Sequence, residues 1–350
     1  MNSPDPRETD APHEPAGGPT PVPIPAPVMP PSAGARLPSV RIGIWGGTAS
    51  GKTTFLAALP IAVANDPATY GTWRVSGTTE EATRFLLDGV DTLTRQRQFP
   101  NATLAPARLA WSFHGETIEP GRGPSLLRRR PRRRESEFVL EIQDAPGVAY
   151  SQNRVAPDVV DFLAEANGIL YLFDPLAGDA ATDNFQYFYG VLQMLVARTA
   201  AVGKLERGRL PQHVAVCVTK FDDPVIFNNA VRAGFVTQDA DGGRLPKVPD
   251  THAQAYFDWT CQNHRHSGAP LVREALRTFF LAERVSYFAT SAIGFHLNWS
   301  DTFDFRDFIN IEHVEGRPRV RGLARPINVI EPLVTLERGI RGRLGRDARN

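Results

Sequence analysis

The fold of this chain is decided by the stretch Gly46-Gly47-Thr48-Ala49-Ser50-Gly51-Lys52-Thr53. This octapeptide fits the pattern G-x-x-x-x-G-K-[ST], a loop whose backbone N–H groups surround phosphate. The apolar residues 40–45 precede it and predict a strand, and residues 54–59 follow it and predict a helix. A chance match would lack this context of strand, loop and helix. We therefore expect a phosphate-binding loop rather than a glycine-rich turn with a surface lysine.

The residue types of the loop explain its predicted chemistry. Gly46 and Gly51 allow the backbone to curl so that successive N–H groups face inward, and the helix that follows adds its positive N-terminal end. Lys52, which we predict to be catalytic, can reach the β- and γ-phosphate oxygens, and the Thr53 hydroxyl can ligate Mg²⁺. The residues expected to contact nucleotide here are Gly46, Gly47, Thr48, Ala49, Ser50, Gly51, Lys52, Thr53 and Thr54.

The composition is typical of a globular protein. The chain has 350 residues, of which 42% are hydrophobic, enough to bury a substantial core. Its net charge of +1 neither favours nor excludes a polyanion partner, and its two cysteines, Cys217 and Cys261, predict no disulfide framework. The sequence shows neither a signal-peptide pattern nor an apolar run long enough for a transmembrane segment. We therefore expect a cytoplasmic protein.

The chain is expected to contain one folded domain behind a tail. Residues 1–39 are rich in proline and small residues, which cannot form a ladder or collapse, so they predict a disordered tail. A polyproline ligand for a partner is the functional alternative. Residues 40–344 are expected to form the domain, and residues 345–350 a flexible end. Insertions are expected at about 65–102, 115–136, 223–267 and 295–325.

Strand and helix patterns alternate along the domain. Predicted strands lie at about 73–75, 109–113, 137–142, 168–173, 212–219 and 284–289. Predicted helices lie at about 80–96, 158–166, 183–202, 271–281 and 327–344. Residues 223–267 are read as polar and irregular, and residues 295–325 have no clear pattern. The alternation predicts an α/β fold with a mostly parallel sheet and helices on both faces, whose ligands bind at the carboxyl ends of the strands.

Three further motifs follow predicted strands. Asp144-Ala145-Pro146-Gly147 comes after the strand 137–142, where Asp144 could hold Mg²⁺, usually through a water, and the Gly147 N–H could meet the γ-phosphate. Thr219-Lys220-Phe221-Asp222 matches [NT]-K-x-D, in which one carboxylate accepts from both guanine N1–H and the N2 amine. Ser291-Ala292-Ile293 matches the S-A-x loop, whose Ala292 N–H would reach guanine O6. An ordinary Asp-Pro-Gly turn is the alternative for the first motif.

The order of these motifs resembles that of P-loop GTPases of the translation-factor-related class (TRAFAC), which includes Ras-like proteins. The resemblance covers about residues 40–340 and implies a three-layer P-loop NTPase fold with one antiparallel strand. The stretches 44–46, 53–59, 99–103 and 329–333 are also similar to the bacterial double-GTPase group, which is associated with multi-component conflict or signalling systems.

The resemblance also implies a switch threonine just before the antiparallel strand, closing over Mg²⁺ and the γ-phosphate. Thr103 precedes the strand predicted at 109–113, so we assign it this catalytic and metal-binding role, as we assign Gly147 a catalytic one. Thr78, Thr79 and Thr83 are alternatives that lie farther from that strand.

The chain departs from the family at the position of the glutamine that orients the attacking water. Val148 stands there, and Gln152 has the wrong spacing. Slow intrinsic hydrolysis is therefore expected. An arginine supplied by a partner is one route to faster hydrolysis, and the internal candidates are Arg95, Arg97 and Arg154.

The resemblance implies a Mg²⁺-dependent GTPase that binds GTP and GDP and acts as a switch. Its implied partners are an unidentified protein effector or activating protein, and a homodimer formed through the switch surfaces. A nucleotide-binding scaffold that never hydrolyses GTP is one alternative, which Val148 favours. An ATPase of another P-loop class is a second alternative, against which Asp222 speaks.

Two remaining features have plain interpretations. The run Arg128–Arg134 is expected to be a solvated loop, and weak contact with nucleic acid, anionic lipid or an acidic partner is its functional alternative. Cys261, His264 and His266 lack a fourth ligand and a familiar spacing, so they predict a polar loop rather than a zinc site.

Overall fold

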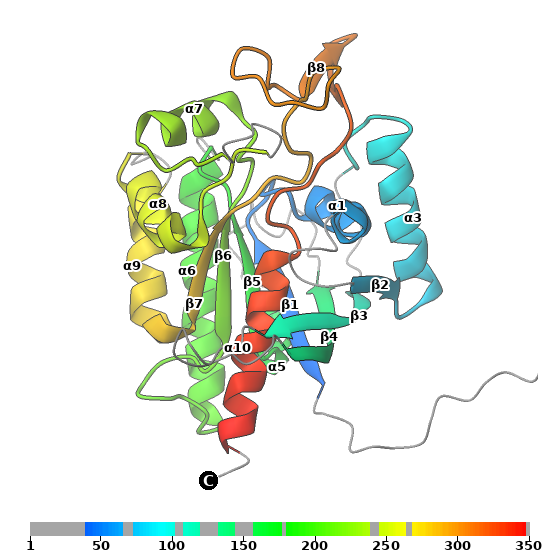
Figure 1. Cartoon of the computed structure of the whole chain (residues 1–350). Helices are drawn as coiled ribbons and strands as arrows, with labels where there is room; N and C mark the ends of the chain where they lie inside the picture. The colour runs from blue at the N-terminus through cyan, green and yellow to red at the C-terminus, as the bar shows by residue number, and fades with distance from the viewer. Residues whose placement is uncertain are drawn as a thin grey trace, which may run out of the picture. The chain divides into compact units, whose positions relative to one another are not determined.

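The computed structural model describes residues 39–65, 73–101, 108–119, 132–143, 157–176, 180–238, 245–263 and 268–347. Seven strands within these residues form one sheet in the order β2-β3-β4-β1-β5-β6-β7 (Figure 1). They are β1 Val40–Gly46, β2 Trp73–Gly77, β3 Arg108–Glu119, β4 Arg132–Gln143, β5 Gly168–Phe173, β6 His213–Val218 and β7 Val285–Ala289. All neighbours from β4 to β7 are parallel, whereas β3 is antiparallel to β2 and β4. The predicted sheet, with its antiparallel strand, is confirmed.

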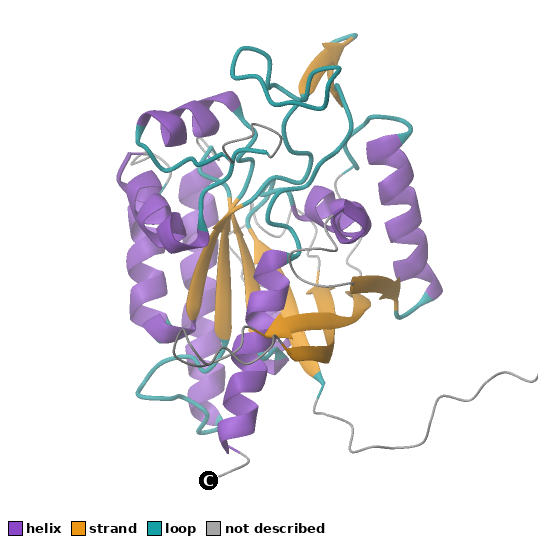
Figure 2. Ribbon diagram, in the orientation of Figure 1, coloured by secondary structure: helices purple, strands orange, loops and turns teal. Residues whose placement is uncertain are grey.

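Helices cover both faces of this sheet, as Figure 2 shows. They are α1 Lys52–Asn65, α3 Glu80–Thr94, α5 Pro157–Glu165, α6 Ala180–Ala201, α7 Pro224–Arg232, α8 Asp250–Asn263, α9 Ala269–Phe279, η2 Ala282–Arg284 and α10 Glu331–Asp347. The predicted three-layer α/β fold is therefore confirmed, and most helix bounds lie within a few residues of those expected.

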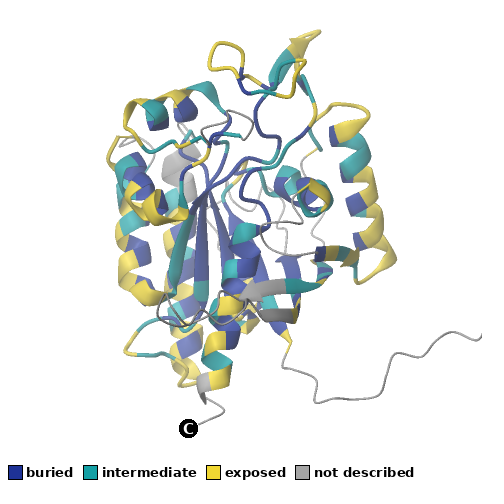
Figure 3. Ribbon diagram, viewed as in Figure 1, coloured by how far each residue is buried: buried dark blue, intermediate teal, exposed yellow. Residues whose placement is uncertain are grey.

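The two faces of the sheet form two hydrophobic clusters because side chains alternate along each strand. On β5, Ile169 and Tyr171 belong to the cluster with α5, α6, α8 and α9. Leu170 and Leu172 belong to the other cluster, which includes residues of α1 and α10. Figure 3 shows the central strands buried and the outer sides of the helices exposed. All six residues of β5 are buried, as expected for a central parallel strand.

The hairpin of β3 and β4 is longer than the sequence predicts. We expected the insertion 115–136 and its arginine run to form a solvated loop, but the ladder pairs Thr117 with Arg134 and Glu119 with Arg132. The end of the run, from Arg132, therefore belongs to β4, and the loop interpretation is wrong for it. Polar residues continue a strand readily when a partner strand supplies the backbone hydrogen bonds. Arg128–Pro131 lie outside the described residues.

The polar, irregular interpretation of residues 223–267 is wrong, because the segment contains α7 and α8. Asp223 caps α7, and its carboxylate accepts from Val225 N at 2.8 Å. Helix α8 packs on the sheet through Phe257, whose ring lies 5.0 Å from that of Tyr287 on β7. Cys261 is fully buried in the same cluster. His264 and His266 lie outside the described residues.

Residues 295–325 contain a small second sheet, which the sequence did not indicate. Strands β8 Ile311–Val314 and β9 Arg317–Val320 pair as an antiparallel hairpin. Val320 N donates to Arg97 O at 2.8 Å, which joins the hairpin to the end of α3. Nearby, Phe295 is buried and lies 4.5 Å from Phe227 of α7. In the part of the chain that the structure describes, every helix is too short or too polar to cross a membrane.

Candidate functional site

The predicted site segments that the structure describes converge on one edge of the sheet. The loop 46–53 follows β1, residues 219–222 follow β6, and residues 291–293 follow β7. Gly46 lies opposite Leu172, and Val218 lies opposite both Phe173 and Ala289. The strands therefore end in register, so that the three loops emerge together at the carboxyl edge, where sheets of this kind bind ligands (Figure 2).

The loop after β1 has the backbone geometry that its glycines predict. Gly51 has φ +90° and Ala49 has φ +60°, both in the left-handed region. A Cβ on Gly46 would lie 2.6 Å from Ser50 Oγ and 2.7 Å from Leu172 O, so only glycine fits there. Phe55 N donates to Gly51 O at 2.8 Å and starts the hydrogen bonding of α1. The loop therefore leads directly into a helix N-terminus, which favours an anion.

Lys52 is held over this loop. Its Nζ donates to Gly46 O and to Gly47 O, each at 3.0 Å. These bonds place the ammonium group beside the backbone that would surround phosphate. Thr53 is the second residue of α1, directly behind Lys52, and Thr54 follows it; all three side chains are only partly exposed.

Asp222 and Ser291 form a buried pair across two loops. Ser291 Oγ donates to Asp222 Oδ1 at 2.5 Å. Both residues are buried, since Ser291 is 1% exposed and Asp222 is 8% exposed. Burial raises the pKa of Asp222 to about 6, although the hydroxyl of Ser291 lowers it in part. Ser291 Oγ also accepts from Gly294 N at 2.7 Å, which fixes the turn that contains Ala292 and Ile293. A carboxylate that is buried at the sheet edge can accept from a ligand with strong selectivity.

Lys220 connects these loops to a residue that the sequence analysis missed. Its Nζ donates to Asp174 Oδ2 at 2.7 Å, and Asp174 directly follows β5. Lys220 itself has φ +57°, in the left-handed region that non-glycine residues seldom adopt. Asp174 had one available signal: it is a lone acid at the end of a fully apolar strand, at the same edge as the other motifs.

Further hydrogen bonds connect the loop Thr219–Asp222 to the neighbouring segments. Thr219 N donates to Phe173 O at 2.9 Å, and Thr219 Oγ1 donates to the same carbonyl at 3.1 Å. Phe221 N donates to Thr290 O at 3.0 Å. The loop Thr219–Asp222 is therefore fixed to the strands on both of its sides, so the position of Asp222 does not depend on a ligand.

Several of the predicted site residues lie outside the described residues. They are Thr103, Asp144, Gly147, Val148, Gln152 and Arg154. The magnesium site therefore has only Thr53 among the described residues. Within the described residues, no group of three or more His, Cys, Asp and Glu side chains could hold a metal ion. Thr53, at the N-terminus of α1, has the position of the Ser/Thr whose hydroxyl ligates Mg²⁺ in the motif G-x-x-x-x-G-K-[ST].

The alternative switch threonines have structural partners. Thr79 caps α3, and its hydroxyl accepts from Ala82 N at 3.1 Å. Thr83 Oγ1 donates to Thr79 O at 2.9 Å, and Thr78 Oγ1 donates to Ala110 O at 2.9 Å. The hydroxyls of Thr79 and Thr83 hold the first turn of α3, and that of Thr78 joins the preceding residue to β3, so each would have to leave its partner to reach a metal.

The arginines near the end of α3 also have local partners. Arg95 Nη2 donates to Asp91 Oδ2 at 3.0 Å, one helical turn away. Arg97 Nη1 donates to Arg321 O at 3.2 Å. Each would have to leave its partner to act on a nucleotide.

No family model and no curated protein sequence matches this chain. Solved structures similar to it include the signal recognition particle receptor SRb-GTP/SRX complex from Chaetomium thermophilum, at 14% identity and a TM-score of 0.34, over 73% of this chain and 92% of that one. The GTP-bound GTPase-like domain of S. cerevisiae Ski7 has 12% identity and a TM-score of 0.36, over 86% and 50%. Elongation factor SelB from Methanococcus maripaludis has 13% identity and a TM-score of 0.23, over 56% and 25%. The chain thus spans half of the Ski7 chain and a quarter of the SelB chain.

Proposed function

We propose that this protein is a Mg²⁺-dependent GTP-binding switch. The observation that carries the proposal is the convergence of the loop after β1 and the buried Asp222 at one edge of the sheet. The loop suits the phosphates, while the Asp222 carboxylate suits the two neighbouring N–H donors of guanine. Adenine offers no such pair of donors, so its binding would leave the buried carboxylate with the Ser291 hydroxyl but without a hydrogen bond from the base, at a cost of about 1–3 kcal/mol.

Each residue of the proposed site has a distinct role. Lys52 would turn from the loop carbonyls toward the phosphates, and the Ala292 N–H would reach guanine O6. Lys220, braced by Asp174, would lie over the base with its aliphatic stem. Mg²⁺, when bound, neutralises phosphate charge, and we assign Thr53 to hold it together with Asp144 and Thr103.

The proposed switch depends on two loops that respond to the γ-phosphate. Thr103 and Gly147 would hold these loops in the GTP state and release them after phosphate leaves. Hydrolysis would be slow, because Val148 cannot orient water as a glutamine can. We place the protein in the cytoplasm of a bacterium, in a multi-component signalling or conflict system of the double-GTPase kind, with an effector, an activating protein or a second copy as its partner.

Calorimetric titration of the full chain with GTP, GDP and ATP, each with and without Mg²⁺, tests the proposal. We expect GTP and GDP to bind at least about 100-fold more tightly than ATP, since two carboxylate hydrogen bonds separate the bases. Mg²⁺ should strengthen GTP binding more than GDP binding, because only GTP presents a γ-phosphate to the metal. Equal affinity for ATP and GTP would instead favour an ATPase of another P-loop class.

A scaffold that binds GTP without cleaving it is the second candidate, and Val148 is the observation that favours it. Single-turnover release of radioactive phosphate from GTP separates the two. Slow release that depends on Mg²⁺ and is lost in Lys52→Ala supports the enzyme. Complete absence of release, also after addition of cell extract, supports the scaffold.

A further inference from the structure

A second pocket lies at the opposite edge of the sheet from the proposed nucleotide site. Its lining includes Arg41 near the start of β1, Asn167 before β5, and His213 at the start of β6. The five residue-to-residue steps from Arg41 to Gly46 separate the two edges by about 17 Å along β1, at about 3.3 Å per step. The pocket has a volume of about 860 Å³, which suits a small molecule. This inference goes beyond the proposed function and does not depend on it.

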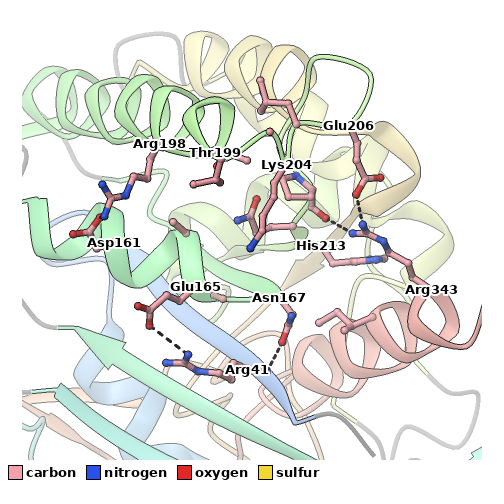
Figure 4. A pocket seen from close by; sticks show the side chains of 18 of the residues that line it. Arg41, Asp161, Glu165, Asn167, Arg198, Thr199, Lys204, Glu206, His213 and Arg343 are labelled. Atoms are coloured by element: carbon pink, nitrogen blue, oxygen red, sulfur yellow. Dashed lines mark hydrogen bonds and ion pairs between the residues drawn. The ribbon is translucent and has the colours of Figure 1, made fainter. Parts of the chain in front are cut away.

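The end of α6 and the C-terminal half of α10 form walls of the pocket. Helix α6 ends where Gly203, at φ +65°, turns the chain and Lys204 N donates to Thr199 O at 3.0 Å. Helix α10 approaches the strand edge closely, because Gly339 has no side chain to strike the ring of His213. After the turn at Gly203, the residues Lys204, Leu205 and Glu206 line the pocket, and Figure 4 labels Lys204 and Glu206 there.

One side of the pocket carries balanced charge. Arg198 pairs with Asp161 at 3.0 Å, and Arg41 pairs with Glu165 at 3.3 Å (Figure 4). Because both pairs lie near the protein surface, each contributes little attraction for an ion from solution.

The other side carries an excess of positive charge. Glu206 accepts from Arg284 at 2.5 Å and also from Arg343, so one carboxylate faces two guanidinium groups. Lys204 is exposed, and its ammonium group has no ion-pair or hydrogen-bond partner among the residues that the structure describes. In Figure 4, Lys204 lies between the Arg198–Asp161 pair and the Glu206–Arg343 pair. This half of the pocket therefore favours an anionic group, with Lys204 as its first contact.

The lining also contains an apolar strip and an unsatisfied acceptor. Val202 is 61% exposed, a large fraction for a valine, and the partly buried Leu205 and Leu344 line the same pocket. Gln212 is 2% exposed, and its Nε2 donates to Leu163 O at 3.3 Å. Its Oε1 has no hydrogen-bond partner among the described residues, which costs free energy that a ligand donor could recover.

We propose that this pocket binds a small amphiphilic anion, a carboxylate or a phosphate ester that carries an apolar body and an N–H or O–H donor. The anionic group contacts Lys204, the apolar body covers Val202 and Leu344, and the donor bonds to Gln212 Oε1. The charge, the apolar body and the donor of the ligand therefore each contact a different part of the lining.

Anilinonaphthalene sulfonate is a suitable probe, because it combines a sulfonate, an aromatic body and one N–H, and its fluorescence rises in apolar sites. We would titrate it into the full chain without nucleotide, so that the result does not depend on the proposed GTP site. 8-Hydroxyoctanoate and 8-hydroxyoctyl phosphate, each of which has an anionic group, an apolar body and an O–H donor, are then added as competitors, which distinguishes a carboxylate ligand from a phosphate ester. We expect one of them to displace the probe.

The variant that decides the matter is Lys204→Glu, with Lys247→Glu as the matched control. Both lysines are exposed and both changes alter the charge equally, but Lys247 does not line the pocket. We expect Lys204→Glu to weaken probe binding about tenfold, and Lys204→Arg and Lys247→Glu to change it less than about threefold. Val202→Asp, at a second exposed position, should weaken it as well.

The proposal fails if Lys204→Glu binds the probe as the native chain does, or if Lys247→Glu weakens it to the same extent, since the probe would then sense only the overall charge. It also fails if neither 8-hydroxyoctanoate nor 8-hydroxyoctyl phosphate displaces the probe. Circular dichroism and thermal unfolding of each variant verify that the fold is intact, as expected for changes at exposed positions.

Discussion

Replacing Asp222 by asparagine tests the proposed recognition of guanine, because Asp222→Asn keeps the size of the side chain and removes its charge. A carboxylate accepts from both guanine donors, whereas an amide accepts from one and turns its own N–H toward the other. Hydrogen bonds to a charged group contribute about 1.5–3 kcal/mol each. Losing one such bond and weakening the other should reduce GTP affinity by about 3 kcal/mol, a factor on the order of 100.

The same substitution should stabilise the nucleotide-free protein. Burial raises the pKa of Asp222 to about 6 from an ordinary value of 3.8, and the Ser291 hydroxyl offsets only part of the rise. A carboxyl whose pKa rises on folding stabilises the fold fully below its unfolded pKa, and this stability is lost as the pH rises through about 6. At neutral pH the ionised group therefore costs up to about 3 kcal/mol, which Asp222→Asn removes.

Two measurements on the full chain test both effects. Calorimetric titration at neutral pH compares GTP with xanthosine triphosphate, whose C2 carbonyl oxygen replaces the guanine amine and can accept from the asparagine amide. Thermal unfolding without nucleotide measures the gain in stability. Asp88→Asn is the matched control, because Asp88 is exposed on α3, away from the carboxyl edge loops.

The expected result is weaker GTP binding, stronger xanthosine triphosphate binding and a higher melting temperature. Unchanged GTP affinity would show that Asp222 does not contact the base. If both nucleotides bound more weakly and the protein also melted earlier, Asp222 would be a structural residue of its loop, and the reasoning from its burial would be refuted.

Three further substitutions test the surroundings of the site. Gly46→Ala should lower stability by roughly 1–3 kcal/mol and weaken GTP binding in calorimetry, because its Cβ would lie 2.7 Å from a backbone carbonyl; native-like values would contradict the observed loop geometry. Asp174→Asn should speed GTP dissociation about tenfold in stopped-flow measurements, because Lys220 loses its ion pair; an unchanged rate would remove Lys220 from the site. Burial acts to raise the pKa of Glu141, but hydrogen bonds from the guanidinium groups of Arg41 and Arg108 outweigh burial and lower that pKa. The ionised Glu141 side chain therefore stabilises the fold above the pKa that it has in the unfolded chain, and this stabilisation is lost as the pH falls through its pKa in the folded protein. In Glu141→Gln, the free energy of unfolding measured in urea should therefore depend less on pH between about 5 and 3 than it does in the native chain.

The sequence predicted those parts of the site whose backbone geometry restricts residue type. Gly46 cannot carry a side chain, and Gly51 has a positive φ, so both leave a direct trace in the sequence. The strands β5 and β6 are buried on both faces and therefore appear as continuous apolar runs. Features of this kind are local, and a window of a few residues contains all of their information.

Long-range packing left weaker traces. Helix α8 buries Ala253, Tyr256, Phe257 and Cys261 at helical spacing, but polar residues between these positions, such as Gln254 and Asp258, gave the segment the composition of a loop. Asp174 is a single residue without a motif, and its pairing with Lys220 depends on β5 and β6 lying side by side. The arginines at the start of β4 belong to a strand only because β3 pairs with them. None of these contacts can be inferred from one segment alone.

The burial of Asp222 connects the two kinds of information. The loop that contains Asp222 is held by backbone hydrogen bonds and by the bond from the Ser291 hydroxyl to Asp222. The side-chain oxygen of an asparagine at position 222 could accept that bond from Ser291 equally well. An ionised carboxylate at this place therefore lowers the stability of the empty protein without being required by the fold. A ligand that donates two hydrogen bonds returns this free energy on binding, whereas a ligand without donors does not. A ligand with two adjacent donors, such as the guanine base of the proposed function, would therefore gain binding free energy at Asp222 that a ligand without donors would not.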